Sequence, residues 1–363
     1  MKTYRVGLIG FGLIGKVHAY AYSVLKYYYD LPFQVELYGL CSRTAETLRK
    51  GESYGFQFMT TDFQELIVRP EVDVIDICCP NTAHLFPLRE TLKRNKPVYC
   101  EKPVVTSLEE VSEVEKLLPS YTATNQVTFH NRFYPATLKT KELLENGFLG
   151  TPISFRVAYY HSGSLDPEKP IGWKQEKGAG LLLDLGSHAL DLVYWFLGRV
   201  DRVIGQTRIL YPCRPAITGE KVPVEVEDYA LVMLCLENGA RGTVEVSKVA
   251  AGSEDDLSYE LYGTGGAIRY HSMEPNFLHI YDARAGDGFI ALPTVQRYAE
   301  SCFPGPKFSI GWVRGHIHAI YSFLKAVHLS HPASPSLVDG LYNTRIIEAV
   351  KRSEKTARWE RID

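Results

Sequence analysis

The chain has 363 residues, of which 45% are hydrophobic and 23% are charged, and its formal net charge is −2. This length and composition are typical of a soluble globular protein with two domains. The near-neutral charge argues against a nucleic-acid or anionic-membrane partner, and no apolar run is long enough to span a bilayer. The first expected strand begins almost at Met1, which leaves no room for a signal peptide, and the seven cysteines include no C-x-x-C pair. We therefore expect a cytoplasmic protein.

A glycine pattern near the N-terminus stands where an apolar strand gives way to a helix. The six residues of this turn are Gly10, Phe11, Gly12, Leu13, Ile14 and Gly15. Gly10 permits a tight turn, Gly12 lets the backbone approach a pyrophosphate, and Gly15 lets helix and strand pack closely. An ordinary glycine-rich turn is the alternative. A second apolar strand at 35–40 has the spacing of a βαβ unit, so we predict that residues 10–15 bind a dinucleotide.

Residues 1–128 alternate expected strands with expected helices. The strands lie at 35–40, 56–59, 72–79, 97–101 and 122–128, after the first strand at 4–9. Continuous apolar strands separated by helices predict a doubly wound parallel sheet of the Rossmann type, with ligands beyond the carboxyl ends of the strands. We assign 1–128 as the dinucleotide-binding domain.

The pattern changes beyond about residue 132. Longer strands with alternating polarity are expected at 153–160, 203–210, 228–236, 242–249, 258–262 and 278–281, and helices at 138–145, 183–197, 316–328 and 338–356. These elements predict an α+β domain over 129–363, with a large, mostly antiparallel sheet covered by helices on one face.

The end of the second strand bears on the choice of cofactor. NAD sites usually carry a carboxylate there for the ribose 2′-hydroxyl, whereas NADP sites place an arginine near the 2′-phosphate. Here the chain has Ser42 and Arg43, which can donate to a phosphate, although a solvated loop arginine is the ordinary alternative. The sequence favours NADP(H) over NAD(H).

Two further strand ends and one helix carry side chains with useful chemistry. Pro80, Asn81 and His84 follow one strand, and Glu101 with Lys102 ends the next, where a lysine can hold a substrate oxygen and the nicotinamide ribose. Asp184 and His188 are four residues apart on an expected helix, so they share a face, and a carboxylate beside an imidazole supports proton abstraction. The alternative is a capping aspartate with a buried structural histidine.

We predict no metal site. His316 and His318 are two residues apart on an expected helix and so point in different directions, and no cysteine or carboxylate cluster accompanies them. We assign both histidines to the structure.

Together these stretches resemble the Gfo/Idh/MocA family of oxidoreductases, which includes glucose–fructose oxidoreductases and inositol dehydrogenases. The resemblance covers essentially the whole chain. It rests on the order of Gly10-x-Gly12-x-x-Gly15 with His18, Pro80-Asn81-x-x-His84, Glu101-Lys102-Pro103, Asn131-Arg132-Phe133-x-Pro135 and Asp184-x-x-x-His188. It implies a Rossmann domain, a nicotinamide cofactor, a sugar, inositol or anhydro-sugar as substrate, and a homodimer or homotetramer formed through the C-terminal sheet.

The resemblance also implies roles for individual residues. Lys102, Asp184 and His188 match the family's catalytic trio, and Pro80, Asn81, His84 and Glu101 match its nicotinamide-ribose contacts. Asn131 departs from the pattern, because many members have an aromatic residue there. We expect the substrate to meet the trio and further side chains at Asn131, Arg132, Tyr160, His161 and Trp173.

The expected reaction is hydride transfer, in which His188 takes the hydroxyl proton, Asp184 supports the imidazole and Lys102 polarises the oxygen. Two alternatives within the family stay open: a glycosidase that retains its dinucleotide and acts by transient oxidation, and a dinucleotide-binding regulator without turnover. A zinc-dependent polyol dehydrogenase would need a ligand cluster that the sequence lacks.

Overall fold

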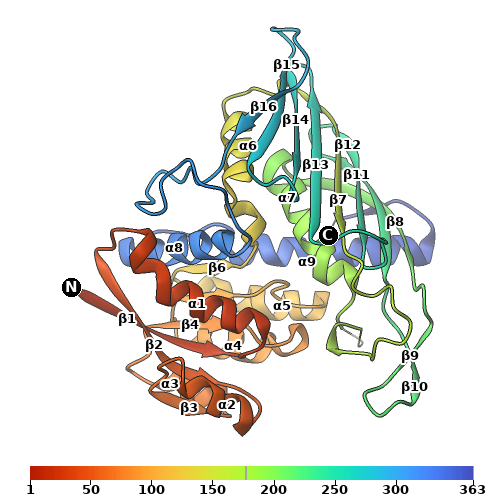
Figure 1. Cartoon of the computed structure of the whole chain (residues 1–363). Coiled ribbons are helices and arrows are strands. Elements are labelled where there is room, and N and C mark those ends of the chain that lie inside the picture. The colour runs from red at the N-terminus through yellow and green to blue at the C-terminus, as the bar shows by residue number, and fades with distance from the viewer. Residues whose placement is uncertain (176–177, 363) are drawn as a thin grey trace. The chain divides into compact units, whose positions relative to one another are not determined.

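The computed structural model describes residues 1–175 and 178–362, apart from the side chain of Gln175, and the chain forms two compact units (Figure 1). The first unit comprises residues 1–133 and 297–341, and the second comprises residues 134–296 and 342–363. The sequence predicted one boundary, at 128/129, so the segment 297–341 belongs to the other unit from the one expected.

The first unit is built on a six-stranded parallel sheet in the order β3-β2-β1-β4-β5-β6. Its strands are β1 (Lys2–Ile9), β2 (Phe33–Cys41), β3 (Phe58–Thr60), β4 (Val74–Ile77), β5 (Val98–Cys100) and β6 (Asn125–Val127). Its helices are α1 (Leu13–Tyr28), α2 (Ala45–Glu52), α3 (Phe63–Val68), α4 (Leu85–Lys93), α5 (Leu108–Leu117), α8 (Val313–Leu329) and the first turn of α9 (Leu337–Thr356). This strand order is that of a Rossmann dinucleotide-binding sheet, as predicted.

Helices cover both faces of the first sheet, and each face has its own apolar core. On one face, α1 and α8 pack against β1 and β2 through residues such as Leu25 and Ile320. On the other, α3, α4, α5 and the start of α9 pack against β4 and β5 through residues such as Leu66 and Leu88. The apolar face of α8 is therefore part of the first core, which explains why 297–341 returns to this unit.

The second unit is built on a nine-stranded mixed sheet in the order β16-β15-β14-β13-β7-β12-β11-β8-β17. The strands are β7 (Pro152–Tyr160), β8 (Val200–Arg208), β11 (Tyr229–Leu236), β12 (Arg241–Ser247), β13 (Asp256–Gly263), β14 (Gly266–His271), β15 (Phe277–Asp282), β16 (Ile290–Pro293) and β17 (Glu360–Arg361). All neighbours are antiparallel except β12 and β7. A separate hairpin joins β9 (Cys213–Pro215) to β10 (Lys221–Pro223).

One face of this large sheet is covered by α6 (Pro135–Glu145), α7 (Ser187–Leu197) and most of α9. The inward positions of β7 are Phe155, Val157 and Tyr159, which alternate with more exposed residues as the period of a strand requires. The other face leaves apolar side chains in solvent, including Met233, which is 50% exposed. Within the described part of the chain, no helix is long and apolar enough to cross a membrane.

Candidate active site

The glycine turn after β1 has the geometry that a dinucleotide cradle needs. Gly10 has a φ of 99°, and a Cβ there would lie 2.6 Å from the backbone of Cys78. A Cβ on Gly15 would lie 2.3 Å from the carbonyl oxygen of Gly10, so helix and strand meet closely. A Cβ on Gly12 would meet no atom of the described residues within 4 Å. The space therefore lies at Gly12, where a pyrophosphate would approach the N-terminus of α1.

The side chains of the same turn divide between the core and the solvent. Phe11 is buried and packs edge-to-face against Phe56 and Tyr54. Leu13 is 75% exposed at the first turn of α1, and Ile14 is half-buried. Phe11 thus anchors the turn, whereas the backbone and Leu13 are left to meet a ligand.

Ser42 and Arg43 follow β2, as predicted. The Ser42 backbone donates to the Thr60 carbonyl at 3.1 Å, which fixes the loop against β3, while Arg43 is exposed. Burial first, and then the carboxylates of Asp62 and Glu65, raise the pKa of Cys41 to about 12. Two carboxylates therefore lie near this strand end. Asp62 accepts from the backbone of Gln64 and Glu65 accepts from the Thr60 hydroxyl.

The loop after β4 carries the predicted residues Pro80, Asn81 and His84. Pro80 is exposed and Asn81 is largely buried at the start of a 3-10 turn. His84 is completely buried, with Nδ1 2.8 Å from the Pro103 carbonyl and Nε2 2.7 Å from the Cys79 carbonyl. Burial lowers the pKa of His84 more than these carbonyls raise it. Both ring nitrogens of His84 therefore contact backbone carbonyls, one in its own loop and one in the loop after β5.

Glu101 and Lys102 follow β5 at the carboxyl edge of the sheet. The Glu101 carboxylate accepts from the Lys102 backbone at 3.2 Å and lies 3.3 Å from the His18 ring. The Lys102–Pro103 peptide bond is cis. Lys102 is half-buried, so its side chain starts from a fixed backbone at the place where ligands of such sheets bind.

In the second unit, the expected helix at 183–197 begins with a π-helical turn. Residues Leu182–Gly186 form the π turn and α7 begins at Ser187. Gly180 has a φ of 107°, and the Glu227 carboxylate accepts from the Leu182 backbone at 2.8 Å, which fixes the approach. Asp184 lies within this π turn, which is wider than an α-helical turn by one residue, and His188 lies in the first turn of α7.

Asp184 is 8% exposed and meets two lysines. Its Oδ2 lies 2.9 Å from Lys174 Nζ and 3.0 Å from Lys248 Nζ. Lys248 is the more buried of the two, with 12% of its side chain exposed against 47% for Lys174. The two ammonium groups hold this carboxylate in place and offset its charge, a feature that the sequence analysis missed because nothing in the spacing links these residues.

His188 is 4% exposed and its ring packs edge-to-face against Tyr159, with centroids 6.1 Å apart. The Tyr159 hydroxyl donates to Asp255 Oδ1 at 2.6 Å, and His161 Nε2 lies 3.0 Å from the same oxygen. Burial and then Asp255 raise the pKa of Tyr159 well above its usual value. Burial opposes ionisation of Asp255, but the bonds from His161 and Tyr159 outweigh it and lower the pKa. This group therefore combines the buried imidazole of His188 with the hydroxyl of Tyr159 and the carboxylate of Asp255.

The other expected substrate residues lie as follows. Tyr160 is on the opposite face of β7 from Tyr159, where its hydroxyl donates to Glu245 at 2.7 Å, so the structure does not bring it to His188. Trp173 is 42% exposed in a short 3-10 turn. In the first unit, Asn131 and Arg132 are buried at 4% and 2% exposure in the 3-10 turn His130–Phe133.

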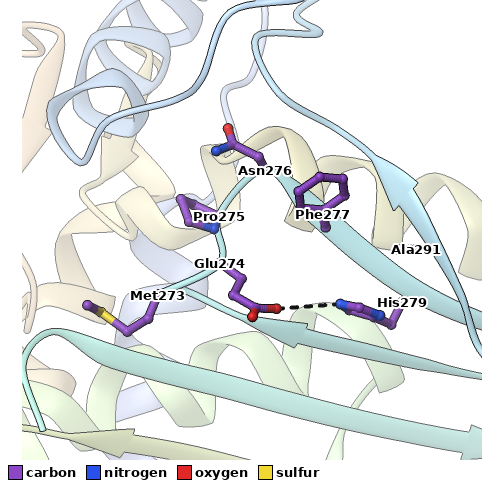
Figure 2. A pocket seen from close by; sticks show the side chains of 7 residues that line it. All are labelled: Met273, Glu274, Pro275, Asn276, Phe277, His279 and Ala291. Carbon is purple, nitrogen blue, oxygen red and sulfur yellow. Dashed lines mark ion pairs between the residues drawn. The ribbon is translucent and has the colours of Figure 1, made fainter.

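A shallow pocket of 360 Å³ lies elsewhere in the second unit, around the turn before β15 (Figure 2). Glu274 and His279 face each other across it at 3.7 Å. The full lining is Met273, Glu274, Pro275, Asn276, Phe277, His279 and Ala291. None of the predicted site residues lines this pocket, so it is not the candidate active site.

His18, Asp76, Cys78, Glu101 and His316 come together in the first unit. Two overlapping groups of three, His18 with Glu101 and His316, and His18 with Asp76 and Cys78, have possible ligand atoms within 4.8 Å of one another. The sequence predicted no such cluster. His316 contributes to it, whereas His318 hydrogen-bonds Tyr29 instead, so the two histidines do point in different directions.

Two family models match the chain and agree with this geometry. The model for the oxidoreductase family with an NAD-binding Rossmann fold matches residues 4–129, and the GFO/IDH/MocA C-terminal domain matches residues 137–269. The chain belongs to the Gfo/Idh/MocA family of oxidoreductases. It is an NAD-binding oxidoreductase with a Rossmann domain followed by the family's α+β domain, as the sequence indicated.

Relatives match this family member over its full length. It is 29% identical to levoglucosan dehydrogenase of Pseudarthrobacter phenanthrenivorans, with 99% of this chain and 98% of that protein covered. It is 25% identical to myo-inositol 2-dehydrogenase of Thermotoga maritima, with 99% and 98% covered. A solved structure of levoglucosan dehydrogenase with NADH and L-sorbose matches with a TM-score of 0.95 and 29% identity over all of both chains.

Proposed function

We propose that this oxidoreductase oxidises a hydroxyl-bearing carbon of a sugar, inositol or anhydro-sugar to the ketone, or catalyses the reverse reduction. The observation that carries the proposal is the polar group around His188, in which the buried imidazole adjoins Tyr159, with the lysine-paired carboxylate of Asp184 in the π turn just before α7. The names of full-length relatives as levoglucosan and inositol dehydrogenases support the substrate class.

In this proposal His188 takes the proton of the substrate hydroxyl as the neighbouring C–H bond breaks, and returns it in the reverse direction. Asp184, fixed by Lys248 and Lys174, accepts a substrate hydroxyl and orients it. Lys102 donates to the reacting oxygen and stabilises the negative charge that develops on it. Lys102 belongs to the first unit, and Asp184 and His188 belong to the second.

The residues after β1 fit a nicotinamide dinucleotide, because Gly12 leaves open space at the N-terminus of α1. Gly10, Gly12 and Gly15 would hold the pyrophosphate, Asn81 and Lys102 would meet the nicotinamide ribose, and Arg43 would meet the adenosine end. The bound dinucleotide supplies the hydride acceptor or donor. His84 and Glu101 stabilise the loops at the carboxyl edge of the sheet through the contacts described above.

We further propose a preference for NADP(H). Arg43 is exposed and forms no ion pair with the described residues, and the nearby carboxylates Asp62 and Glu65 already accept hydrogen bonds of their own. A titration of both reduced cofactors tests this, with Arg43→Ala expected to weaken NADPH binding more than NADH binding. Arg49, an exposed arginine on α2, provides a matched control. Tighter binding of NADH than NADPH by the wild type would refute the preference.

The exposed side of the large sheet offers a surface for self-association. Leu231 and Met233 alternate with the inward residues of β11 and are 38% and 50% exposed. Burying such side chains against a second copy would favour a homodimer or homotetramer. Sedimentation of the wild type and of Met233→Lys tests this, since a monomeric wild type would exclude it.

The two family alternatives have distinct signatures. A glycosidase would be purified with its dinucleotide bound and would cleave a glycosidic bond without net change in cofactor absorbance. A regulator would bind dinucleotide without turnover of any sugar. The relatives reported above are dehydrogenases and favour neither alternative.

A screen of inositols, aldoses and anhydro-sugars with NAD⁺ and NADP⁺, read by absorbance of the reduced nicotinamide, tests the proposed function directly. The expected result is turnover of at least one polyol or sugar that is lost in His188→Ala. Cofactor binding without turnover across the screen would refute the dehydrogenase proposal.

A further inference from the structure

A completely buried histidine, His18 on α1, lies between two carboxylates in the first unit. Its Nδ1 is 3.0 Å from Asp76 Oδ2, and its Nε2 is 3.3 Å from Glu101 Oε1. Asp76 is on β4 and Glu101 directly follows β5, so the imidazole joins two neighbouring strands at the carboxyl edge of the sheet. The proposed mechanism leaves His18 and Asp76 without a function.

The surroundings of His18 favour its cationic form. Burial alone would lower its pKa, but Asp76 and then Glu101 outweigh burial and raise the pKa to about 10. The same charge acts on His316, whose pKa is lowered to about 3 by burial and then by His18. At neutral pH the cluster therefore holds one imidazolium, His18, beside one neutral imidazole. Three further titratable side chains adjoin this cluster: Cys78 after β4, Tyr22 on α1 and Tyr99 on β5. Burial is the main cause that raises the pKa of each of them.

Glu101 connects this cation to the proposed oxygen-binding lysine. One carboxylate oxygen faces His18, and the other accepts the backbone N–H of Lys102 at 3.2 Å. Burial would raise the pKa of Glu101, but the bond and charge of His18 lower it below the usual value. The carboxylate is thus kept charged by His18, and in that form it holds the backbone from which the Lys102 side chain extends.

We propose that His18 is a positioning residue for the reaction, acting through Glu101 to fix Lys102 at the carboxyl edge of the Rossmann sheet, with Asp76 orienting the imidazole from behind. The inference rests on the proposed function only in assigning Lys102 to the reacting oxygen. A histidine whose second nitrogen is held by a carboxylate has a fixed ring orientation, which is the property that a positioning group requires.

The same atoms could in principle hold a metal ion, since His18, Glu101 and His316 have ligand atoms within 4.8 Å. The two carboxylates that flank His18 favour a proton on its ring. A metal at His18 Nε2 would have to displace a proton held with a pKa of about 10, which weakens binding at pH 7 by roughly three decades. We therefore treat a bound metal as an outcome that would overturn the proposal.

Two substitutions divide the function of the ring between its nitrogens. His18→Gln places an amide N–H near the Nε2 position, so it keeps a neutral contact with Glu101. His18→Asn places an amide N–H near the Nδ1 position, so it keeps a contact with Asp76 and loses the contact with Glu101. We expect His18→Asn to lower kcat about ten- to a hundredfold, the worth of a buried contact with a charged group, and His18→Gln to lower it less. Equal losses would count against action through Glu101.

The pH profile separates positioning from mere packing. Without the cation, burial raises the pKa of Glu101, so the acid limb of kcat in His18→Asn should move to higher pH, and activity should partly recover as pH rises. His318→Asn is the control, because His318 is a half-buried histidine of the same unit that hydrogen-bonds Tyr29 instead of a carboxylate. The control should lose stability and keep the wild-type pH profile. An unmoved acid limb in His18→Asn would make the role of His18 structural only.

Two measurements keep this test separate from the proposed function. Nitrogen NMR of labelled His18 in the full chain reads its protonation without any turnover, and it should report an imidazolium up to about pH 9. In a Lys102→Met background, His18→Asn should have little further effect on kcat. A neutral His18 at pH 7, additive losses, or stoichiometric metal in the purified protein would each overturn the inference. Absence of any sugar turnover together with an imidazolium at His18 would refute the proposed function alone.

Discussion

The open space at Gly12 leads to a sharp prediction for cofactor binding. Gly12 precedes α1 with a φ of −74° and a ψ of −158°, which any residue adopts, and a Cβ there meets no described atom within 4 Å. Gly12→Ala should therefore fold normally. Alanine lowers the conformational entropy of the unfolded chain and so stabilises the fold by about 0.4–1 kcal/mol, which offsets a loss of similar size for alanine at a helix N-cap.

The added methyl group should instead act on the ligand. It would occupy the space where the pyrophosphate approaches the backbone, and overpacking of one methyl group costs about 1–3 kcal/mol, or roughly 5- to 150-fold in Kd. Fluorescence titration with NADH and NADPH, together with urea unfolding, measures both effects in one preparation. The expected result is a large rise in Kd with a free energy of unfolding within about 0.5 kcal/mol of wild type.

Two glycines serve as controls. Gly15→Ala would place its Cβ 2.3 Å from the Gly10 carbonyl oxygen, so it should destabilise the fold itself by about 1–3 kcal/mol. Gly305→Ala would meet the ring of Phe308 at an ordinary 3.7 Å, so it should leave affinity unchanged and raise stability by no more than about 1 kcal/mol. Unchanged dinucleotide affinity in Gly12→Ala would refute the reasoning, because the pyrophosphate could not then lie against this turn.

Three further outcomes follow from the buried polar groups. Folded His318 has a pKa of about 3, against 6.5 in the unfolded chain, so the free energy of unfolding should decrease as the pH is lowered below 6.5 and the unfolded chain takes up a proton. Folded His18 has a pKa of about 10, so the free energy of unfolding should also decrease as the pH is raised from 6.5 to 10. Urea unfolding from pH 5 to 9 checks both limbs, and His318→Asn should flatten only the acid one. Tyr159→Phe keeps the ring against His188 but loses the bond to Asp255, so it should cost about 1 kcal/mol of stability and leave the Kd for NADH unchanged. Lys248→Met removes the better buried partner of Asp184 and should lower kcat/KM about tenfold or more, and wild-type values would contradict that pairing.

The Rossmann sheet could be predicted almost completely from the sequence, because its signals are local. Apolar strands end in Gly10, Ser42, Pro80 and Lys102, and the helices between them have clear periods. The placement of α8 could not be predicted, since its apolar face is equally suited to either sheet and only packing assigns it to the first core.

The candidate site in the second unit was predicted only in part. The spacing of Asp184 and His188 assumed an α-helix, and no sequence rule anticipates the π turn at Leu182–Gly186. The alternation along β7 could have predicted that Tyr159, and not Tyr160, lies on the inward face. Tyr159 has the same parity as the buried Phe155, and Tyr160 has the opposite parity. Nothing in the sequence around Lys248 indicated that this lysine would pair with Asp184.

Asp76 was a usable signal that the sequence analysis did not follow. A carboxylate in the middle of a fully buried strand requires a partner, and the pattern that includes Gly10 and Gly15 also includes His18. The pairing of these two residues and its extension to Glu101 depend on strand order, which places β4 between β1 and β5.

The central claim is that Lys102 and His188 serve the same chemical step of the proposed reaction, and a double-mutant cycle tests it most directly. The measurement is kcat/KM for wild type, Lys102→Met, His188→Ala and the double variant, with the Kd for NADH of each. We predict that His188→Ala loses about 10²- to 10⁴-fold with nearly unchanged NADH affinity, and that the double variant loses little more than the worse single variant. A His188→Ala enzyme within a few-fold of wild type, or fully additive losses, would contradict the claim.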